Sequence, residues 1–253
     1  MPYASNAGIQ IHYEVAGTGP PLVLQHGFLC SLDDWYELGY VATLSTQYRL
    51  ILVDGRGHGD SDKPHDEASY TLDYRVGDVT SVLDAVEVER AHFWGYSMGG
   101  YIGFGMAKYA PHRVHRLVIG GAHPYARDGA GYRSAIRGLM AAGGGDATVA
   151  AFEADAGPLP EGLKGRLRKA DLQAFLAAAG DRPAMDDVLE TMMIPCCLYA
   201  GEADPLLAAA RSASEHIPHA QFFSLPGLSH WKAFEERSAV LPKVVEFLGA
   251  GGA

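Results

Sequence analysis

The order of apolar and polar positions along the chain predicts strands that alternate with helices. Residues 9–15 alternate between apolar and polar side chains, which is typical of a half-exposed antiparallel strand. Three later runs are short and almost continuously apolar, namely residues 21–25, 48–53 and 115–119. This pattern is typical of parallel strands that are buried on both faces. Between them, residues 72–88 and 97–109 carry apolar side chains at helical spacing. This alternation favours a parallel sheet with helices on both sides.

The pattern changes in the middle of the chain. Residues 124–191 contain no convincing strand and are rich in alanine, glycine and charged residues, with short helical stripes. Strand-like runs resume at 194–199 and 221–225, and a helical stripe closes the chain. We therefore expect one α/β core domain, residues 1–123 and 192–253, interrupted by a helical lid at 124–191.

Composition excludes several classes of partner. Of the 253 residues, 48% are hydrophobic and 20% are charged, which is ordinary for a globular protein. The formal net charge of −10 argues against a nucleic-acid partner, because such proteins present a basic surface. A strongly anionic substrate would meet a repulsive average field unless a local basic patch overrides it.

The three cysteines and the start of the chain indicate in which cellular compartment the protein is expected. Cys196 and Cys197 are neighbours on a predicted strand and point to opposite faces, so they are poor disulfide partners. With Cys30 they are expected to be small buried side chains in a reducing compartment. The chain starts without a signal-peptide pattern, and no apolar run approaches the ~20 residues that cross a bilayer. We expect a cytoplasmic protein without a membrane partner.

The strongest chemical signal is Gly95-Tyr96-Ser97-Met98-Gly99. This G-x-S-x-G stretch follows a strand-like run and precedes a helical pattern. A strand that turns sharply into a helix forces the serine into a strained backbone conformation, and glycines two positions away relieve the crowding. The turn lifts the hydroxyl of Ser97 clear of the sheet, so the sequence predicts a nucleophile here.

A serine nucleophile needs a base and an orienting acid. Asp204 follows the strand predicted at 194–199 and precedes a helix, and His230 opens the loop after the last predicted strand. Functional groups gather at the carboxyl ends of parallel strands, so these loops are expected at one edge with Ser97. Glu202 is the rival acid, and the position of Asp204 before the helix favours Asp204.

The loop after the strand at 21–25 predicts an oxyanion hole. Gly27 lets the backbone turn so that the N–H of Phe28 can face a developing oxyanion together with the N–H of Met98. The side chains of Phe28 and Met98 are expected on the acyl side of the pocket. Trp35 is expected in the core. Three further residues are expected at the border of the substrate pocket: His123, Tyr125 and Trp231.

Together these motifs resemble the α/β-hydrolase fold superfamily, of the serine esterase, lactonase and cofactor-free haloperoxidase-like type. The resemblance covers nearly the whole chain, and the segments that carry it are His26–Phe28 with Trp35, Asp54–Ser61, Gly95–Gly100, Gly201–Asp204 and Ser229–Trp231. It implies a mostly parallel eight-stranded sheet and the chain order serine, aspartate, histidine. It also gives the Asp54–Ser61 loop a structural role, so His58 is not expected to be catalytic. One departure is Ser229, where relatives usually have glycine.

The resemblance implies a serine hydrolase that cleaves a small to medium ester or lactone through an acyl-enzyme on Ser97. The lid has few aromatic residues (Tyr132, Phe152 and Phe175), which argues against a lipase-like lid. No metal or cofactor is expected. His230 must be neutral to accept a proton, so activity is expected to fall on the acid side of neutrality.

Alternatives remain open at this point. His230-Trp231 also resembles carbon–carbon bond hydrolases that act on ring-cleavage diketones. Perhydrolase or haloperoxidase activity accompanies some such esterases. A small-molecule receptor on the same fold would bind its ligand at the triad without turnover. A homo-oligomer is also possible, with the lid as the place for its contact.

Overall fold

The computed structural model describes residues 2–249. These residues form one mixed sheet with helices packed on it. Its eight strands lie in the order β1-β2-β4-β3-β5-β6-β7-β8, and only the pairings of β2 with β1 and β4 are antiparallel. The strands are β1 (Tyr3–Asn6), β2 (Ile9–Ala16), β3 (Pro21–Gln25), β4 (Arg49–Val53), β5 (Ala91–Tyr96), β6 (Val114–Gly120), β7 (Cys196–Gly201) and β8 (Gln221–Leu225). The predicted fold class is confirmed.

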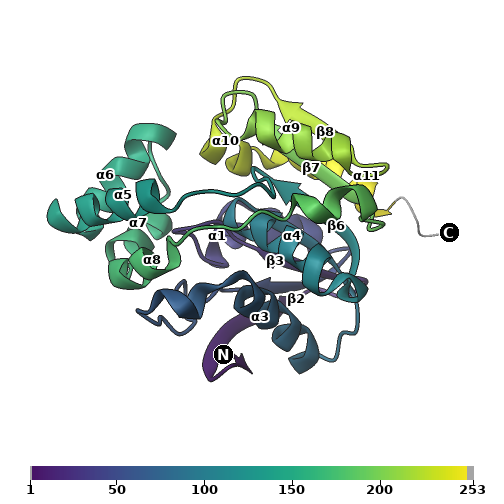
Figure 1. Ribbon diagram of the computed structural model, residues 1–253, viewed down its shortest axis with the longest axis horizontal. Helices are drawn as coiled ribbons and strands as arrows, with labels where there is room; N and C mark the ends of the chain where they lie inside the picture. Colours follow the sequence, from purple (N-terminus) through teal and green to yellow (C-terminus); the bar gives the residue numbers. More distant parts are fainter. Residues whose placement is uncertain (1, 250–253) are drawn as a thin grey trace.

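Helices cover both faces of this sheet (Figure 1). One face packs on α3 (Leu72–Ala85), α4 (Met98–Tyr109) and α9 (Leu207–His216). The other packs on α1 (Asp33–Glu37), α2 (Tyr40–Leu44), α10 (His230–Glu235) and α11 (Arg237–Gly249). The buried side chains of Cys196 and Cys197 belong to opposite faces, as the alternation of a strand requires. Trp35 is completely buried, as expected.

Four further helices follow one another between β6 and β7 and gather at one end of the molecule (Figure 1). They are α5 (Ala130–Ala141), α6 (Gly145–Ala156), α7 (Glu161–Arg168) and α8 (Leu172–Ala178). A small apolar cluster of Ile136, Leu172 and Phe175 joins α5 and α8 to Phe28 and Leu29. These helices fall within the predicted lid, and the division of the chain into core and lid domains stays a prediction.

Three elements differ from the sequence prediction. The helix expected over 72–88 ends at Ala85, because Glu87 has a positive φ of 56° that a helix cannot continue. The four-residue edge strand β1 is too short to show an alternating pattern. Residue 230 begins the short helix α10 and is not in a loop. Within the described residues, no helix has the length and apolar character needed to cross a membrane.

Candidate active site

Ser97 stands at the turn between β5 and α4 with a backbone conformation that non-glycine residues rarely adopt. Its φ is 53° and its ψ is −108°, and its N–H donates to the Gly120 carbonyl at 2.8 Å. Such conformations cost about 1–3 kcal/mol and persist only where the surroundings impose them. A Cβ on Gly95 would overlap the Gly99 carbonyl, and one on Gly99 would overlap the Gln25 carbonyl. The strained serine turn therefore depends on both glycines, as the sequence predicts.

Substitution of Gly99 by alanine is expected to destabilise the protein by more than about 3 kcal/mol, because the added methyl would meet backbone atoms that cannot rotate away. Gly131→Ala is the matched control, since Gly131 lies in α5 with open space around its Cα and alanine is the better helix former. Urea unfolding of both variants measures the difference. Equal midpoints for the two variants would contradict this account of the turn.

The structure brings together the three residues that the sequence assigned to a catalytic triad. The Ser97 hydroxyl lies 2.9 Å from Nε2 of His230, and Nδ1 of His230 lies 2.6 Å from Oδ2 of Asp204. A carboxylate can only accept, so Nδ1 carries the ring proton and leaves the Nε2 lone pair facing the serine hydroxyl. Asp204 is 4% exposed, and its Oδ1 accepts from the Leu206 N–H at 2.8 Å. This geometry suits proton transfer from Ser97 to His230.

The turn before His230 accommodates Ser229, where the resemblance drawn from the sequence implies glycine. Ser229 has a φ of −73°, which is ordinary for any residue, and its side chain caps α10 by accepting from the Lys232 N–H. The position that requires glycine is Gly201 at the end of β7. A Cβ there would overlap the Leu228 carbonyl of the turn before His230. The Tyr96 hydroxyl donates to the His230 carbonyl and fixes the start of the helix.

The backbone around the predicted oxyanion hole lies beside Ser97. A Cβ on Gly27 would lie 3.4 Å from Cβ of Ser97, so the Gly27–Phe28 peptide is next to the serine. Met98 is the first residue of α4, and the N–H groups of a first helical turn have no acceptor within the helix. The oxyanion roles of Phe28 and Met98 stay predictions.

The side chain of Met98 lies against α3. Its sulfur is 3.1 Å from Nη1 of Arg75, and it lines a separate cavity on the α3 side together with Tyr70. The first side chain of a helix that starts at a strand end is directed by the packing of that helix on α3. Its side chain is therefore not part of the lining of the apolar cavity at Ser97, whereas that of Phe28 is, and the expectation of an acyl side formed by both stays a prediction.

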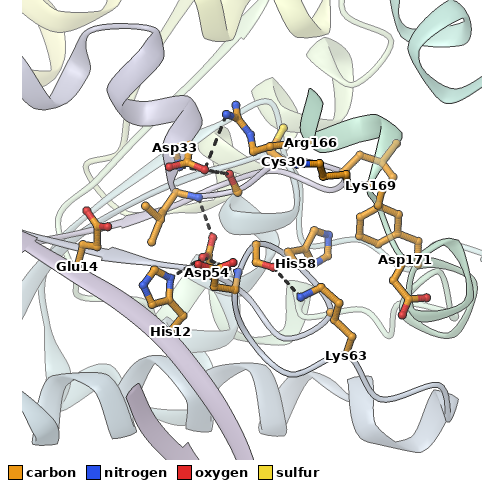
Figure 2. A pocket seen from close by; sticks show the side chains of 18 residues that line it. His12, Glu14, Cys30, Asp33, Asp54, His58, Lys63, Arg166, Lys169 and Asp171 are labelled. Atoms are coloured by element: carbon orange, nitrogen blue, oxygen red, sulfur yellow. Dashed lines mark hydrogen bonds and ion pairs between the residues drawn. The ribbon is translucent and has the colours of Figure 1, made fainter. Parts of the chain in front are cut away.

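The Asp54–Ser61 loop connects the segment that follows Phe28 to the sheet (Figure 2). Oδ1 of Asp54 accepts from the Leu32 N–H at 2.9 Å, and Oδ2 accepts from the Asp60 N–H at 3.0 Å and from His12 at 2.8 Å. Burial raises the pKa of Asp54, but the bond from His12 and the nearby imidazole of His26 bring the pKa below its ordinary value. The loop thus fixes the segment that follows Phe28 through the hydrogen bond from Leu32 to Asp54.

His58 of the same loop is buried between aromatic rings. Its ring centre lies 5.5 Å from Phe28 and 4.8 Å from Phe175, and its Nδ1 donates to the Arg56 carbonyl at 3.0 Å. Within the described residues its Nε2 has no hydrogen-bond partner. Burial lowers the pKa of His58 well below the ordinary value of 6.5. His58 makes no contact with the triad in these interactions, which agrees with a structural role.

This buried histidine predicts acid sensitivity of the fold. Below about pH 6.5 the unfolded chain takes up a proton at His58 and the folded chain does not, so stability is lost as the pH falls. His58→Asn keeps a donor toward the Arg56 carbonyl and removes the titration. We expect its melting temperature to fall less than that of the wild type between pH 7 and pH 5. Parallel curves for the two proteins would contradict the assignment.

A cavity of about 270 Å³ opens at Ser97 beside α10, α5 and α6. Its apolar wall is formed by Phe28, Leu29, Leu139, Phe152, Trp231 and Phe234. The sequence placed Trp231 here, and its ring packs against Phe152 with centroids 5.6 Å apart. Leu139 was missed, although its helical spacing from Ile136 marks an apolar stripe on α5. The volume lies just below the common range for ligand pockets, about 300–1,000 Å³.

His123 and Tyr125 line a second, smaller cavity of about 20 Å³ that also reaches Ser97. Their rings stack with centroids 5.6 Å apart, and Nδ1 of His123 accepts from the Tyr125 N–H. Burial, together with Arg127 and Arg182, lowers the pKa of His123. Both arginines line the same cavity, and the sequence analysis missed them.

The residues of this region show no arrangement for a metal ion. Among the residues that the structure describes, no group of three or more histidine, cysteine, aspartate or glutamate side chains is placed to bind one. The rival acid Glu202 is exposed and accepts from the Ser224 hydroxyl at 2.9 Å. Of the two acids, only Asp204 is bonded to His230.

Comparison with known proteins agrees with this fold. A family model of the alpha/beta hydrolase fold matches residues 20–135. The solved structure of an esterase from Rhodococcus sp. is 30% identical, with 99% of each chain covered and a TM-score of 0.83. A hydrolase from Pseudomonas aeruginosa is 27% identical over 98% of each chain, with a TM-score of 0.87. The match to epoxide hydrolase 3 of Siraitia grosvenorii, 36% identical, spans 44% of this chain and only 35% of that relative.

Two features of the chain are typical of the alpha/beta hydrolase fold: the sheet covered by helices on both faces, and the strand–turn–helix unit with Ser97 at its turn. The chain belongs to the alpha/beta hydrolase fold family.

Proposed function

We propose that the protein is a serine hydrolase that cleaves a carboxylic ester or lactone of small to medium size. The observation that carries this proposal is the continuous chain of hydrogen bonds from Ser97 through His230 to Asp204 at the mouth of an apolar cavity. Its similarity over the full length to an esterase from Rhodococcus sp. supports the same reaction class.

In the proposed reaction, Ser97 attacks the carbonyl carbon while Nε2 of His230 takes its proton. Asp204 holds the imidazole with Nδ1 protonated and stabilises the imidazolium that forms. The N–H groups of Phe28 and Met98 stabilise the oxyanion, at about 3–4 kcal/mol for each donor. His230 then protonates the leaving alkoxide. A water molecule activated by His230 hydrolyses the acyl-enzyme, releases the acid and restores Ser97.

Steady-state hydrolysis of p-nitrophenyl esters from acetate to laurate tests the proposal. We expect many turnovers per enzyme with an optimum at short to medium acyl chains, because the cavity of about 270 Å³ lies below the common range for ligand pockets, about 300–1,000 Å³. A fluorophosphonate probe should label Ser97 at the same time. A stall after one acylation would favour the receptor alternative. An absence of any turnover would leave the fold intact and reject simple esters as substrates.

A further inference from the structure

Arg127 and Arg182 form a pair of like charges next to the nucleophile. Their backbones exchange two hydrogen bonds of 2.9 Å in an isolated antiparallel bridge, which joins the start of the lid segment to its end. Residues directly opposite in an antiparallel pair project their side chains to the same side. Like charges placed in this way destabilise a pair, so the arrangement calls for a compensating group.

No carboxylate among the described side chains forms an ion pair with either arginine. None of the ion pairs among the described residues includes Arg75, Arg127 or Arg182. Each guanidinium of the pair instead lies over an aromatic ring: Arg127 is 3.9 Å from the ring centre of Tyr132, and Arg182 is 4.7 Å from that of Tyr101. Nε of Arg127 is buried without a hydrogen-bond partner within the described residues.

The surroundings increase the cost of these two charges. Burial, followed by the nearby charges of Arg127 and Arg75, lowers the pKa of Arg182 to about 9. Burial likewise lowers the pKa of Arg127. A buried cation without a partner is expensive, and an anion that enters would recover much of that cost.

The pair faces the reaction centre. Arg127, Arg182 and Ser97 line one cavity together with His123 and Leu206. Its volume of about 20 Å³ has space for little more than one or two water-sized groups, so it selects a small anionic group over a ring or an alkyl chain. The apolar cavity with Trp231 is lined by the same serine.

We propose that Arg127 and Arg182 form a carboxylate subsite, so that the substrates of this enzyme are esters or lactones that carry a free carboxylate close to the scissile carbonyl. This inference rests on the proposed hydrolase function and narrows its substrate class. The two arginines form a local basic patch that overrides the repulsion expected from the net charge of −10. The apolar cavity takes the remainder of the substrate.

Two pairs of esters of equal shape test the subsite. In the first pair, monoethyl succinate carries a carboxylate on the acyl side, where ethyl 4-methylpentanoate has an isopropyl group. In the second pair, O-acetylglycolate carries a carboxylate on the alcohol side, where isobutyl acetate has an isopropyl group. Acid release in a pH-stat measures kcat/KM for each. In at least one pair we expect the anionic ester to be preferred by about tenfold or more, the range of charge-assisted hydrogen bonds.

Arg127→Met and Arg182→Met keep apolar bulk over the tyrosine rings and remove the charge. We expect each to lower kcat/KM for the preferred anionic ester by about tenfold or more and to leave its neutral counterpart within about twofold. Arg182→Lys should retain part of the preference. Arg168→Met is the control, because Arg168 is exposed on α7 and pairs with Asp146. An equal loss for both esters, or no anionic preference in the wild type, would overturn the proposal.

Binding of glutarate to the Ser97→Ala protein, measured by calorimetry, separates the subsite from the reaction. Binding that weakens by about tenfold in Arg127→Met and Arg182→Met supports the subsite even where no ester is turned over, which would reject only the proposed hydrolysis. Glutarate binding that is absent, or is unchanged in the arginine variants, would overturn the subsite even in an active esterase.

Discussion

Ser97→Ala and Ser97→Gly are both expected to reduce kcat for p-nitrophenyl esters by about 10⁵–10⁶-fold, the loss seen when a serine nucleophile is removed from a triad. The hydroxyl of Ser97 is the group that His230 faces at 2.9 Å, and no other hydroxyl is bonded to that imidazole among the described residues. Residual hydrolysis above the uncatalysed rate would come from the oxyanion hole and from substrate binding alone. A variant that retains a tenth of the activity would contradict the assignment.

The same two variants are expected to differ in stability. Alanine keeps the Cβ that makes a φ of 53° unfavourable, whereas glycine adopts this conformation without strain. Relief of about 1–3 kcal/mol exceeds the cost of about 0.5–1 kcal/mol for the greater freedom of glycine in the unfolded chain. Ser97→Gly should therefore be more stable than Ser97→Ala by about 1 kcal/mol in urea unfolding. The reverse order would show that the turn stores no strain.

Much of the sheet could be predicted because its central strands are buried on both faces. The strands β3 and β4 pack between helices on either side and read as nearly unbroken apolar runs. The edge strand β1 makes its pairing with β2 alone and has only Ala4 fully buried, so little in the sequence marks it. Pattern reasoning succeeds here where burial is deep and fails where pairing is the only constraint.

That the candidate residues at the ends of the strands meet could be predicted for a related reason. Ser97, Asp204 and His230 each follow a strand, and a parallel sheet brings those ends together whatever the loops do. The same reasoning could not find Arg127 and Arg182. They meet through a single bridge between two irregular segments, and neither segment has a periodic pattern that would indicate pairing. Local sequence likewise does not tell which way the Met98 side chain turns, because α3 decides it.

Substitution of Asp204, the acid bonded to His230, is expected to have the second large effect on kcat. Asp204→Asn is expected to lower kcat by about 10⁴-fold with little change in fold. An asparagine amide can take the place of the carboxylate beside Nδ1 and then favours the imidazole with its proton on Nε2, so that Nε2 can no longer accept the proton of Ser97. The amide also fails to stabilise the imidazolium. Ester hydrolysis in steady state, with the melting temperature as a check on folding, measures the loss.

Glu202→Gln is the matched control for this substitution. Glu202 lies in the same turn but is exposed, and its carboxylate accepts from Ser224 at the surface and not from His230. Its amide variant should keep kcat within about twofold, since a hydrogen-bond acceptor for Ser224 remains and surface changes of this kind are usually small. If Glu202→Gln were the variant that lost activity, the carboxylate would have to exchange its place with Asp204 during the reaction. Loss in Asp204→Asn alone assigns the acid to the buried carboxylate that already holds His230.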